Sequence, residues 1–171
     1  FTQVGFECEI EGQIIDFDIT PNRGDVLSLR GLEREFLAYQ SIKDSQKLSF
    51  CSLRSQNNKA VINKVDFRGC GNYHLMLIKD LCKIKQLDLK KRDFLTNAGV
   101  QLINPLVDLG NYVMFEMGAP MHVFDLEKLS LPVNIIFPSQ KKTSLKVIGD
   151  NIKDIQPSSL TIQDQSGIQA I

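Results

Sequence analysis

The residues best suited to chemistry in this chain lie close together, between positions 103 and 125. The imidazole of His122 suits a general base, a hydrogen-bond partner for a substrate, or a group that stabilises its own loop. The carboxylate of Glu116 is predicted to point either toward a pocket or into solvent. We therefore group four residues as candidates for one pocket: Asn111, Glu116, Pro120 and His122.

A second cluster of polar residues follows the first predicted strand, at positions 20–25. Pro21 keeps the residue before it extended, and Asn22 favours a turn. Thr20, Asn22 and Arg23 offer groups that either face RNA or brace the turn. In neither cluster is a Ser or Cys nucleophile visibly paired with a histidine, so we assign no catalytic residue.

Composition and charge exclude several classes of protein. The 20 basic and 20 acidic residues give zero net charge, which argues against a general electrostatic grip on nucleic acid but leaves room for a local basic patch. No apolar run approaches the length of a membrane span. The four cysteines show no CxxC spacing and there are only two histidines, so we expect reduced thiols and no metal site.

The first half of the chain shows strand, helix and connector patterns. Alternating apolar residues predict a strand over 14–19, and Asp25 or Ser28 is predicted to cap a helix that fades near residue 40. The expected inner face of this helix holds Leu29, Leu32, Phe36 and Leu37. Residues 41–59 are typical of a polar connector, and strands are expected at 61–65 and 73–78.

The second half begins with two predicted helices. Asp88 is expected to cap the first, which Gly99 ends; Asn104 caps the second, with Pro105 in its first position and Gly118 at its end. The apolar stripe of the second helix comprises Leu106, Leu109, Val113 and Met117. Strands are then expected at 133–137, 145–148, 160–163 and 168–171. We expect an α+β fold in which mixed sheet layers are covered by about three helices.

Two segments together resemble one family. Positions 18–28 read DITPNRGDVLS and positions 31–35 read GLERE, which is similar to the TPNR-x-DCLS…GIARE signature of the bacterial phenylalanyl-tRNA synthetase beta subunit. Positions 103–125 are similar to the same subunit's INP-x-VD-x-TNYVM-x-E-x-G-x-P-MHAFD signature. We call these segments block 1 (18–35) and block 2 (103–125). They occur in the family's order and at about its spacing, and the resemblance spans positions 14–171.

The resemblance implies the fold and activity of the subunit's editing module. This module hydrolyses tyrosine that has been attached to tRNA(Phe) by mistake. An apolar pocket rejects an added hydroxyl only weakly, so a second, hydrolytic site has to supply the discrimination. Hydrolysis of an aminoacyl ester needs a positioned water and stabilisation of the oxyanion more than a covalent nucleophile.

The resemblance also implies the chain's boundaries and partners. Positions 1–13 correspond to the end of the N-terminal segment of the beta subunit, and positions 14–171 to the editing-module domain, truncated at its C-terminal end. The expected partners are the alpha subunit, the rest of the beta subunit and tRNA(Phe), in the cytoplasm and away from any membrane. No cofactor is expected in this fragment, because the ATP and magnesium of the whole enzyme act elsewhere.

The chain departs from the family's pattern where editing is concerned. Family members carry an L-D-G-T-E segment whose glutamate helps to recognise the tyrosine hydroxyl. The corresponding positions 147–152 read VIGDNI, and Asp150 or Asp154 replaces that glutamate only if the backbone shifts. Other departures are Val26 for Cys, Gly110 for Thr, Ala119 for Gln, and Leu131-Pro132 for a glycine pair. We expect the scaffold to be kept and tyrosine editing to be weak or lost.

Other readings of the sequence remain open. The family's RNA-binding insertion before block 1 is expected to be absent, because positions 5–9 join position 14 almost directly. The first alternative is an active deacylase of Tyr-tRNA(Phe) that uses rearranged polar groups. The second is a free-standing aminoacyl-tRNA deacylase or a related RNA-binding module.

Overall fold

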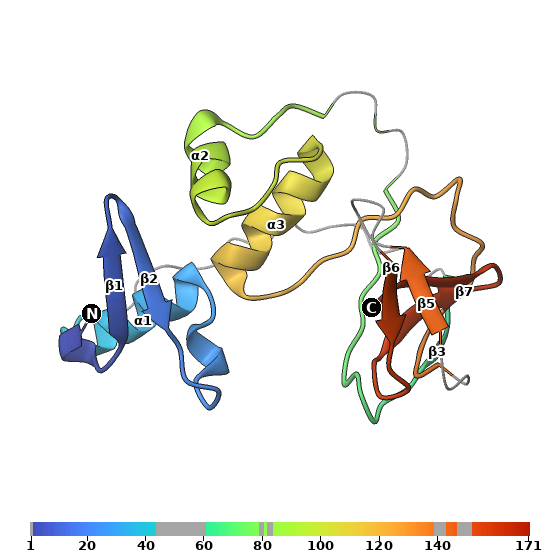
Figure 1. The fold of residues 1–171 in the computed structure, drawn as a ribbon, viewed down its shortest axis with the longest axis horizontal. Helices are drawn as coiled ribbons and strands as arrows, with labels where there is room; N and C mark the ends of the chain where they lie inside the picture. The colour runs from blue at the N-terminus through green and yellow to red at the C-terminus, as the bar shows by residue number, and fades with distance from the viewer. Residues whose placement is uncertain (1, 44–60, 79–80, 82–83, 139–142, 147–151) are drawn as a thin grey trace. The chain divides into compact units, whose positions relative to one another are not determined.

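The chain folds into two compact units, each built from two separate stretches of sequence. The computed structural model describes residues 2–43, 61–78, 81, 84–138, 143–146 and 152–171. Unit 1 comprises Phe1–Cys51 and Leu81–Val123, and unit 2 comprises Ser52–Asp80 and Phe124–Ile171 (Figure 1). The two blocks that carry the family resemblance therefore both belong to unit 1.

Unit 1 contains the three α-helices of the described residues and one hairpin. Its elements are the 3-10 helix η1 (Thr2–Val4), β1 (Glu7–Glu11), β2 (Ile14–Asp18), the 3-10 helix η2 (Gly24–Val26), α1 (Leu29–Tyr39), α2 (Leu89–Asn97) and α3 (Pro105–Met117). Helices α1 and α2 both pack against α3.

The β1–β2 hairpin has one strongly acidic face. Its antiparallel register places Glu7 opposite Asp18 and Glu9 opposite Asp16. Side chains alternate between the two faces of a strand, so these carboxylates share one face. Like charges directly opposite each other are destabilising.

Each α-helix begins at a side chain that caps its free backbone N–H groups. The Ser28 hydroxyl accepts from the N–H of Gly31 at the start of α1, and Asp88 accepts from the N–H of Lys91 at the start of α2. Asn104 accepts from two N–H groups at the start of α3. These caps confirm the predicted starts of all three helices, with Ser28 rather than Asp25 as the cap of α1.

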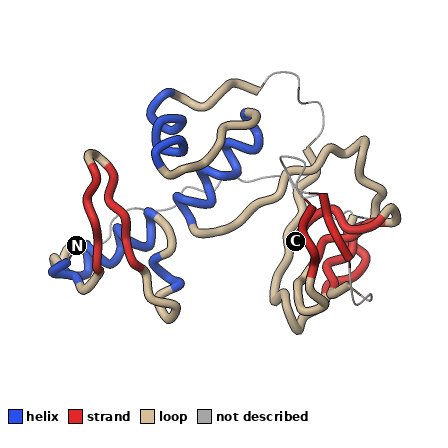
Figure 2. The backbone as a smooth tube through the Cα atoms, in the orientation of Figure 1, coloured by secondary structure: helices blue, strands red, loops and turns tan. Residues whose placement is uncertain are grey.

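Unit 2 is built on a four-stranded mixed sheet and a separate hairpin (Figure 2). The sheet has the order β3-β4-β7-β8, in which only β3 and β4 run parallel. Its core cluster consists of Val133, Ile135, Ile162 and Ala170. The strands of unit 2 are β3 (Ile62–Val65), β4 (Val133–Ile136), β5 (Thr143–Lys146), β6 (Ile152–Ile155), β7 (Thr161–Asp164) and β8 (Gly167–Ala170), with β5 paired to β6.

The α+β class with three helices and mixed sheets is confirmed, although the helices belong to unit 1 and the four-stranded sheet to unit 2. The predicted strand at 73–78 is wrong, because these residues form no strand. Tyr73 and Leu75 pack on the core cluster while His74 and Met76 are exposed. The alternation of buried and exposed residues therefore comes from an extended segment that lies on the core without pairing. Strands β1 and β6 were not predicted, and most of the connector at 41–59 lies outside the described residues.

The predicted inner faces of two helices are only partly correct. Leu29 and Phe36 of α1 are 42% and 39% exposed, and Leu109 of α3 is 43% exposed. The buried residues are instead Gly31 in α1, and Asp108 and Gly110 in α3. These helices are therefore most buried where a small or hydrogen-bonded residue allows close approach.

Two helical glycines are expected to respond to alanine in opposite directions. In Gly31→Ala the new Cβ would lie 2.3 Å from the carbonyl oxygen of Asp25 and 2.8 Å from Cα of Val26. Because backbone atoms have to move, we expect a loss of about 1–3 kcal/mol in the free energy of unfolding. In Gly110→Ala the nearest atom would be Cε of Met121 at 3.8 Å, so we expect a gain of up to about 1 kcal/mol.

Urea unfolding followed by circular dichroism measures both changes. Gly24→Ala is the matched control, because its Cβ would meet nothing within 4 Å. If Gly31→Ala were as stable as the parent, the close approach of the α1 start to residues 25–26 would be refuted.

The buried Asp164 links the segment before β4 to the turn between β7 and β8. Its carboxylate accepts hydrogen bonds from the Ser130 N–H at 2.8 Å, from the N–H and hydroxyl of Ser166 at 2.7 and 2.6 Å, from the Gly167 N–H at 3.1 Å and from Gln169 at 3.0 Å. Burial acts to raise the pKa of Asp164, but the hydrogen bonds from Ser166, Ser130 and Gln169 together lower it to about 2.

Asp164→Asn is expected to lower stability at neutral pH by about 1–3 kcal/mol, since hydrogen bonds to a charged acceptor are replaced. The folded-state pKa lies below the usual 3.8, so the stabilisation is present above about pH 4 and is lost as the pH falls toward 2. Urea midpoints of parent and variant should therefore converge in acid. Asp154→Asn, at an exposed position of β6, is the control; a gap that stays constant with pH would contradict the prediction.

Candidate functional site

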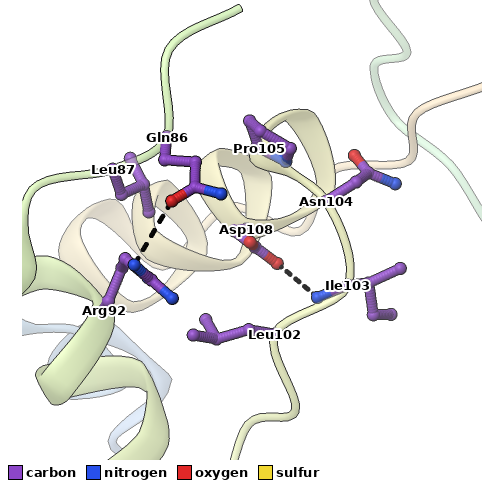
Figure 3. A pocket seen from close by; sticks show the side chains of 8 residues that line it. All are labelled: Gln86, Leu87, Arg92, Leu102, Ile103, Asn104, Pro105 and Asp108. Atoms are coloured by element: carbon purple, nitrogen blue, oxygen red, sulfur yellow. Dashed lines mark hydrogen bonds between the residues drawn. The ribbon is translucent and has the colours of Figure 1, made fainter.

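The start of block 2 is built by side chains that serve the backbone. The Oδ1 of Asn104 accepts from the N–H groups of Leu106 and Val107, both at 3.1 Å, and Pro105 occupies the first position of α3. The buried Asp108 accepts from the N–H of Ile103 at 2.8 Å, as Figure 3 shows. The polar residues that open block 2 therefore form the helix start, which the sequence predicted for Asn104 but not for Asp108.

The end of α3 meets block 1. Gly118 adopts a left-handed conformation, with φ of 78°, and its N–H donates to the carbonyl oxygen of Met114. A Cβ at this position would lie 3.3 Å from Cβ of Ser28 and 3.4 Å from the carbonyl oxygen of Leu27. The close contact brings the last turn of α3 against the cap of α1, so the two blocks share one structural junction.

The loop after α3 returns along the helix. The side chain of Met121 lies beside Gly110, within 3.8–3.9 Å of where its Cβ would be. Pro120 and His122 flank Met121, so the loop brings both near the helical turn that carries Asn111. The contact places this loop beside α3, one residue away from Asn111.

Glu116 lies apart from Asn111 on α3. Five helical residues correspond to a rotation of about 140° and a rise of about 7.5 Å. Asn111 is half-buried, whereas Glu116, Pro120 and His122 are exposed. His122 also takes part in an interaction with its surroundings. That all four residues form one editing pocket stays a prediction.

The turn of block 1 is held by Arg23. Its N–H donates to the carbonyl oxygen of Thr20 at 2.9 Å, and its guanidinium makes two hydrogen bonds of 3.0 Å to Asp25. The same group lies 2.9 Å from Glu35 of α1 and 5.4 Å from the ring centre of Phe6. These contacts brace the turn against α1.

The charges of this network stabilise each other. The hydrogen bonds that Arg23 donates to Asp25 and to Glu35 raise the pKa of Arg23, and the hydrogen bond from Arg23 lowers the pKa of Asp25. Two carboxylates face one guanidinium, so its charge is already compensated. Thr20 and Asn22 of the same turn are exposed.

Two pockets of unit 1 are hollow enough to hold a small group. The first, of about 280 Å³, lies at the start of α3 (Figure 3) and is lined by Gln86, Leu87, Arg92, Leu102, Ile103, Asn104, Pro105 and Asp108. The second, of about 330 Å³, is lined by Leu29, Asp88, Lys90, Lys91, Phe94 and Tyr112. None of the four candidate residues of block 2 lines either of these two pockets.

Within the described ranges, the His, Cys, Asp and Glu side chains form no group of three or more that would hold a metal ion. None of the helices in these ranges combines the length and apolar character that a bilayer crossing needs.

The family model described as the B3/4 domain matches residues 69–171. The chain belongs to the B3/4 domain family.

Three relatives are phenylalanine–tRNA ligase beta subunits. The chain is 29% identical over 158 residues to the phenylalanine–tRNA ligase beta subunit of Mannheimia succiniciproducens, a match that covers 92% of this chain and 20% of the relative. It is 32% identical over 152 residues to that of Colwellia psychrerythraea (89% and 19%) and 32% identical over 168 residues to that of Neisseria meningitidis (97% and 21%). The resemblance to this beta subunit is thus confirmed. The chain spans about a fifth of the length of these relatives.

Asp108 provides a test of the helix start in block 2. Asp108→Ala removes the carboxylate that accepts from the N–H of Ile103, and the loss of a hydrogen bond to a charged group costs about 1.5–3 kcal/mol. Asp108→Asn keeps an acceptor oxygen and should cost less. Unfolding in urea measures both variants.

Asp93→Ala, at an exposed position of α2, is the control for this experiment. Equal stability of the alanine and asparagine variants would show that the hydrogen bond to Ile103 contributes nothing.

Proposed function

We propose that this chain is the section of a phenylalanine–tRNA ligase beta subunit that corresponds to the editing module, with tyrosine editing weak or lost. It acts in the cytoplasm, together with the alpha subunit, the rest of the beta subunit and tRNA(Phe). The observation that carries the proposal is the similarity to phenylalanine–tRNA ligase beta subunits over 89–97% of the chain. Aminoacylation, with its ATP and magnesium, takes place outside this section.

The loss of editing is supported by the residues that would recognise tyrosine. A site that discriminates by a hydroxyl needs a buried hydrogen-bond partner for it. Positions 147–152 contain no glutamate, and 147–151 lie outside the described residues. Asp154, the nearest acidic residue that the structure describes, is exposed on β6.

Gly110 also supports weak editing. It stands where the family has threonine, so the hydroxyl that a threonine would add beside Asn111 is missing. Met121 covers the position instead. Compared with family members that have threonine at this position, the helical turn next to Asn111 therefore has one hydroxyl fewer.

The alternative is an active deacylase of Tyr-tRNA(Phe). It is favoured by the way Met121 brings Pro120 and His122 back to the turn of Asn111. In that case, these residues and main-chain groups would position the hydrolytic water. A deacylation assay separates the two functions.

We expect the complete synthetase, with alpha subunit and full beta subunit, to release little tyrosine from Tyr-tRNA(Phe). The measurement is the rate of tyrosine release at saturating enzyme, compared with release from Phe-tRNA(Phe). A family member that carries the L-D-G-T-E segment is the positive control. Rapid release of tyrosine that is lost in a His122→Ala enzyme would overturn the proposal in favour of the active deacylase.

Asn151→Glu sharpens the test, because it restores a carboxylate at the position where the family's segment has glutamate. If the missing acceptor limits editing, this variant releases tyrosine faster than the parent. Asn151→Gln, which has the same length without the charge, should not.

A further inference from the structure

The second pocket of unit 1 combines cations with aromatic rings and belongs to neither block's predicted site. Helix α2 contributes Lys90, Lys91 and Phe94, and α3 contributes Tyr112. Leu29 at the start of α1, 42% exposed, forms an apolar part of the wall. We call this hollow of about 330 Å³ the α2 pocket.

The segment that forms the α2 pocket is basic in a chain without net charge. Positions 84–94 carry four basic side chains and two acidic ones, Asp88 and Asp93. The ammonium group of Lys91 is paired with Asp88. Lys90 is exposed, and among the described contacts it makes no ion pair, so its charge is available to an anionic ligand.

Two half-buried rings form the aromatic side of the α2 pocket. The Phe94 ring meets the Tyr112 ring edge to face, with centroids 6.0 Å apart and an interplanar angle of 79°. Phe115 supports Phe94 from another direction at 5.6 Å. Lys91 Nζ lies 5.6 Å from the centre of the Tyr112 ring. The rings are therefore fixed in place before any ligand arrives, which lowers the entropic cost of binding.

We propose that the α2 pocket binds a single-stranded stretch of RNA, with one unpaired base against Phe94 and Tyr112 and the adjoining phosphate at Lys90. Stacking on aromatic side chains and cations along the backbone are how proteins hold single-stranded nucleic acid. The inference rests on the proposed function only in expecting that this RNA is part of tRNA.

The rings favour RNA over an acidic peptide. A carboxylate side chain would satisfy Lys90, but it has no planar surface to place against Phe94 and Tyr112. A nucleotide supplies both a ring and a phosphate. Asp88 in the wall opposes any anion, so charge alone makes a weak site and the stacked base has to contribute.

The first experiment measures binding of a fluorescent single-stranded RNA octamer to the full 171-residue chain by anisotropy, at several salt concentrations. Lys90→Ala should weaken binding and reduce the slope of log affinity against log salt by about 0.7, as expected for one lost phosphate contact on a single strand. Asp88→Asn should strengthen binding, because asparagine still caps α2 while the negative charge is removed. Lys43→Ala, at an exposed lysine outside the pocket, is the control.

The second experiment tests the base. An octamer with abasic sugars should bind at least about fivefold more weakly than the normal one, because stacking on an aromatic side chain contributes substantially per base. The chain contains no tryptophan and three tyrosines, so stacking is also visible as a loss of tyrosine emission. In Tyr112→Phe the ring remains and binding persists, but this loss of emission disappears.

The result that supports the proposal is RNA binding that depends on Lys90, increases in Asp88→Asn and changes the emission of Tyr112. Five outcomes would overturn it: no binding of the octamer, equal binding by Lys90→Ala, equal binding of the abasic octamer, equal binding of polyglutamate used as an acidic peptide in place of RNA, or an unchanged emission loss in Tyr112→Phe. Because no aminoacylated tRNA is used, failure here leaves the deacylation result untouched, and the reverse also holds.

Discussion

Close backbone packing around Ser28 is the constraint on which the helical part of unit 1 depends. The hydroxyl of Ser28 caps α1 through the N–H of Gly31, and Gly118 at the end of α3 lies against the same residue. Neither glycine leaves room for a larger side chain without displacing backbone or the cap. The junction explains why two segments far apart in the sequence are both distinctive: each supplies a surface that the other requires.

The sequence predicts the helices of this fold better than its strands. Caps and glycine stops are local chemistry, so Ser28, Asp88, Asn104 and Gly118 locate helix ends without knowledge of the tertiary structure. Strands depend on distant partners: residues 73–78 alternate as a strand does, yet they lie on the core of unit 2 without pairing. The division into two units, each made of two separate stretches of the chain, is not marked by any local sequence pattern.

The candidate site was partly predictable for a similar reason. Polar residues of a family signature are readily predicted to act in a functional site. In this structure, however, Arg23 is paired with Asp25 and Glu35, and Asp108 accepts a hydrogen bond from the backbone of Ile103. Both residues maintain the architecture that surrounds a site. The return of Met121 over Gly110, which brings His122 toward Asn111, is a tertiary event, and only the structure reveals it. Family membership extends these local observations to a class of protein, the B3/4 domain.

The chain's zero net charge hides an uneven distribution of charge, because the β1–β2 hairpin has an acidic face. Positions 7–18 carry five acidic residues and no basic one, while positions 84–92 around the start of α2 have a surplus of positive charge. Two stretches of unit 1 thus carry charge of opposite sign. A polyanion that approaches would be repelled by the hairpin and attracted by the start of α2, so a chain with zero net charge would still favour one orientation toward it.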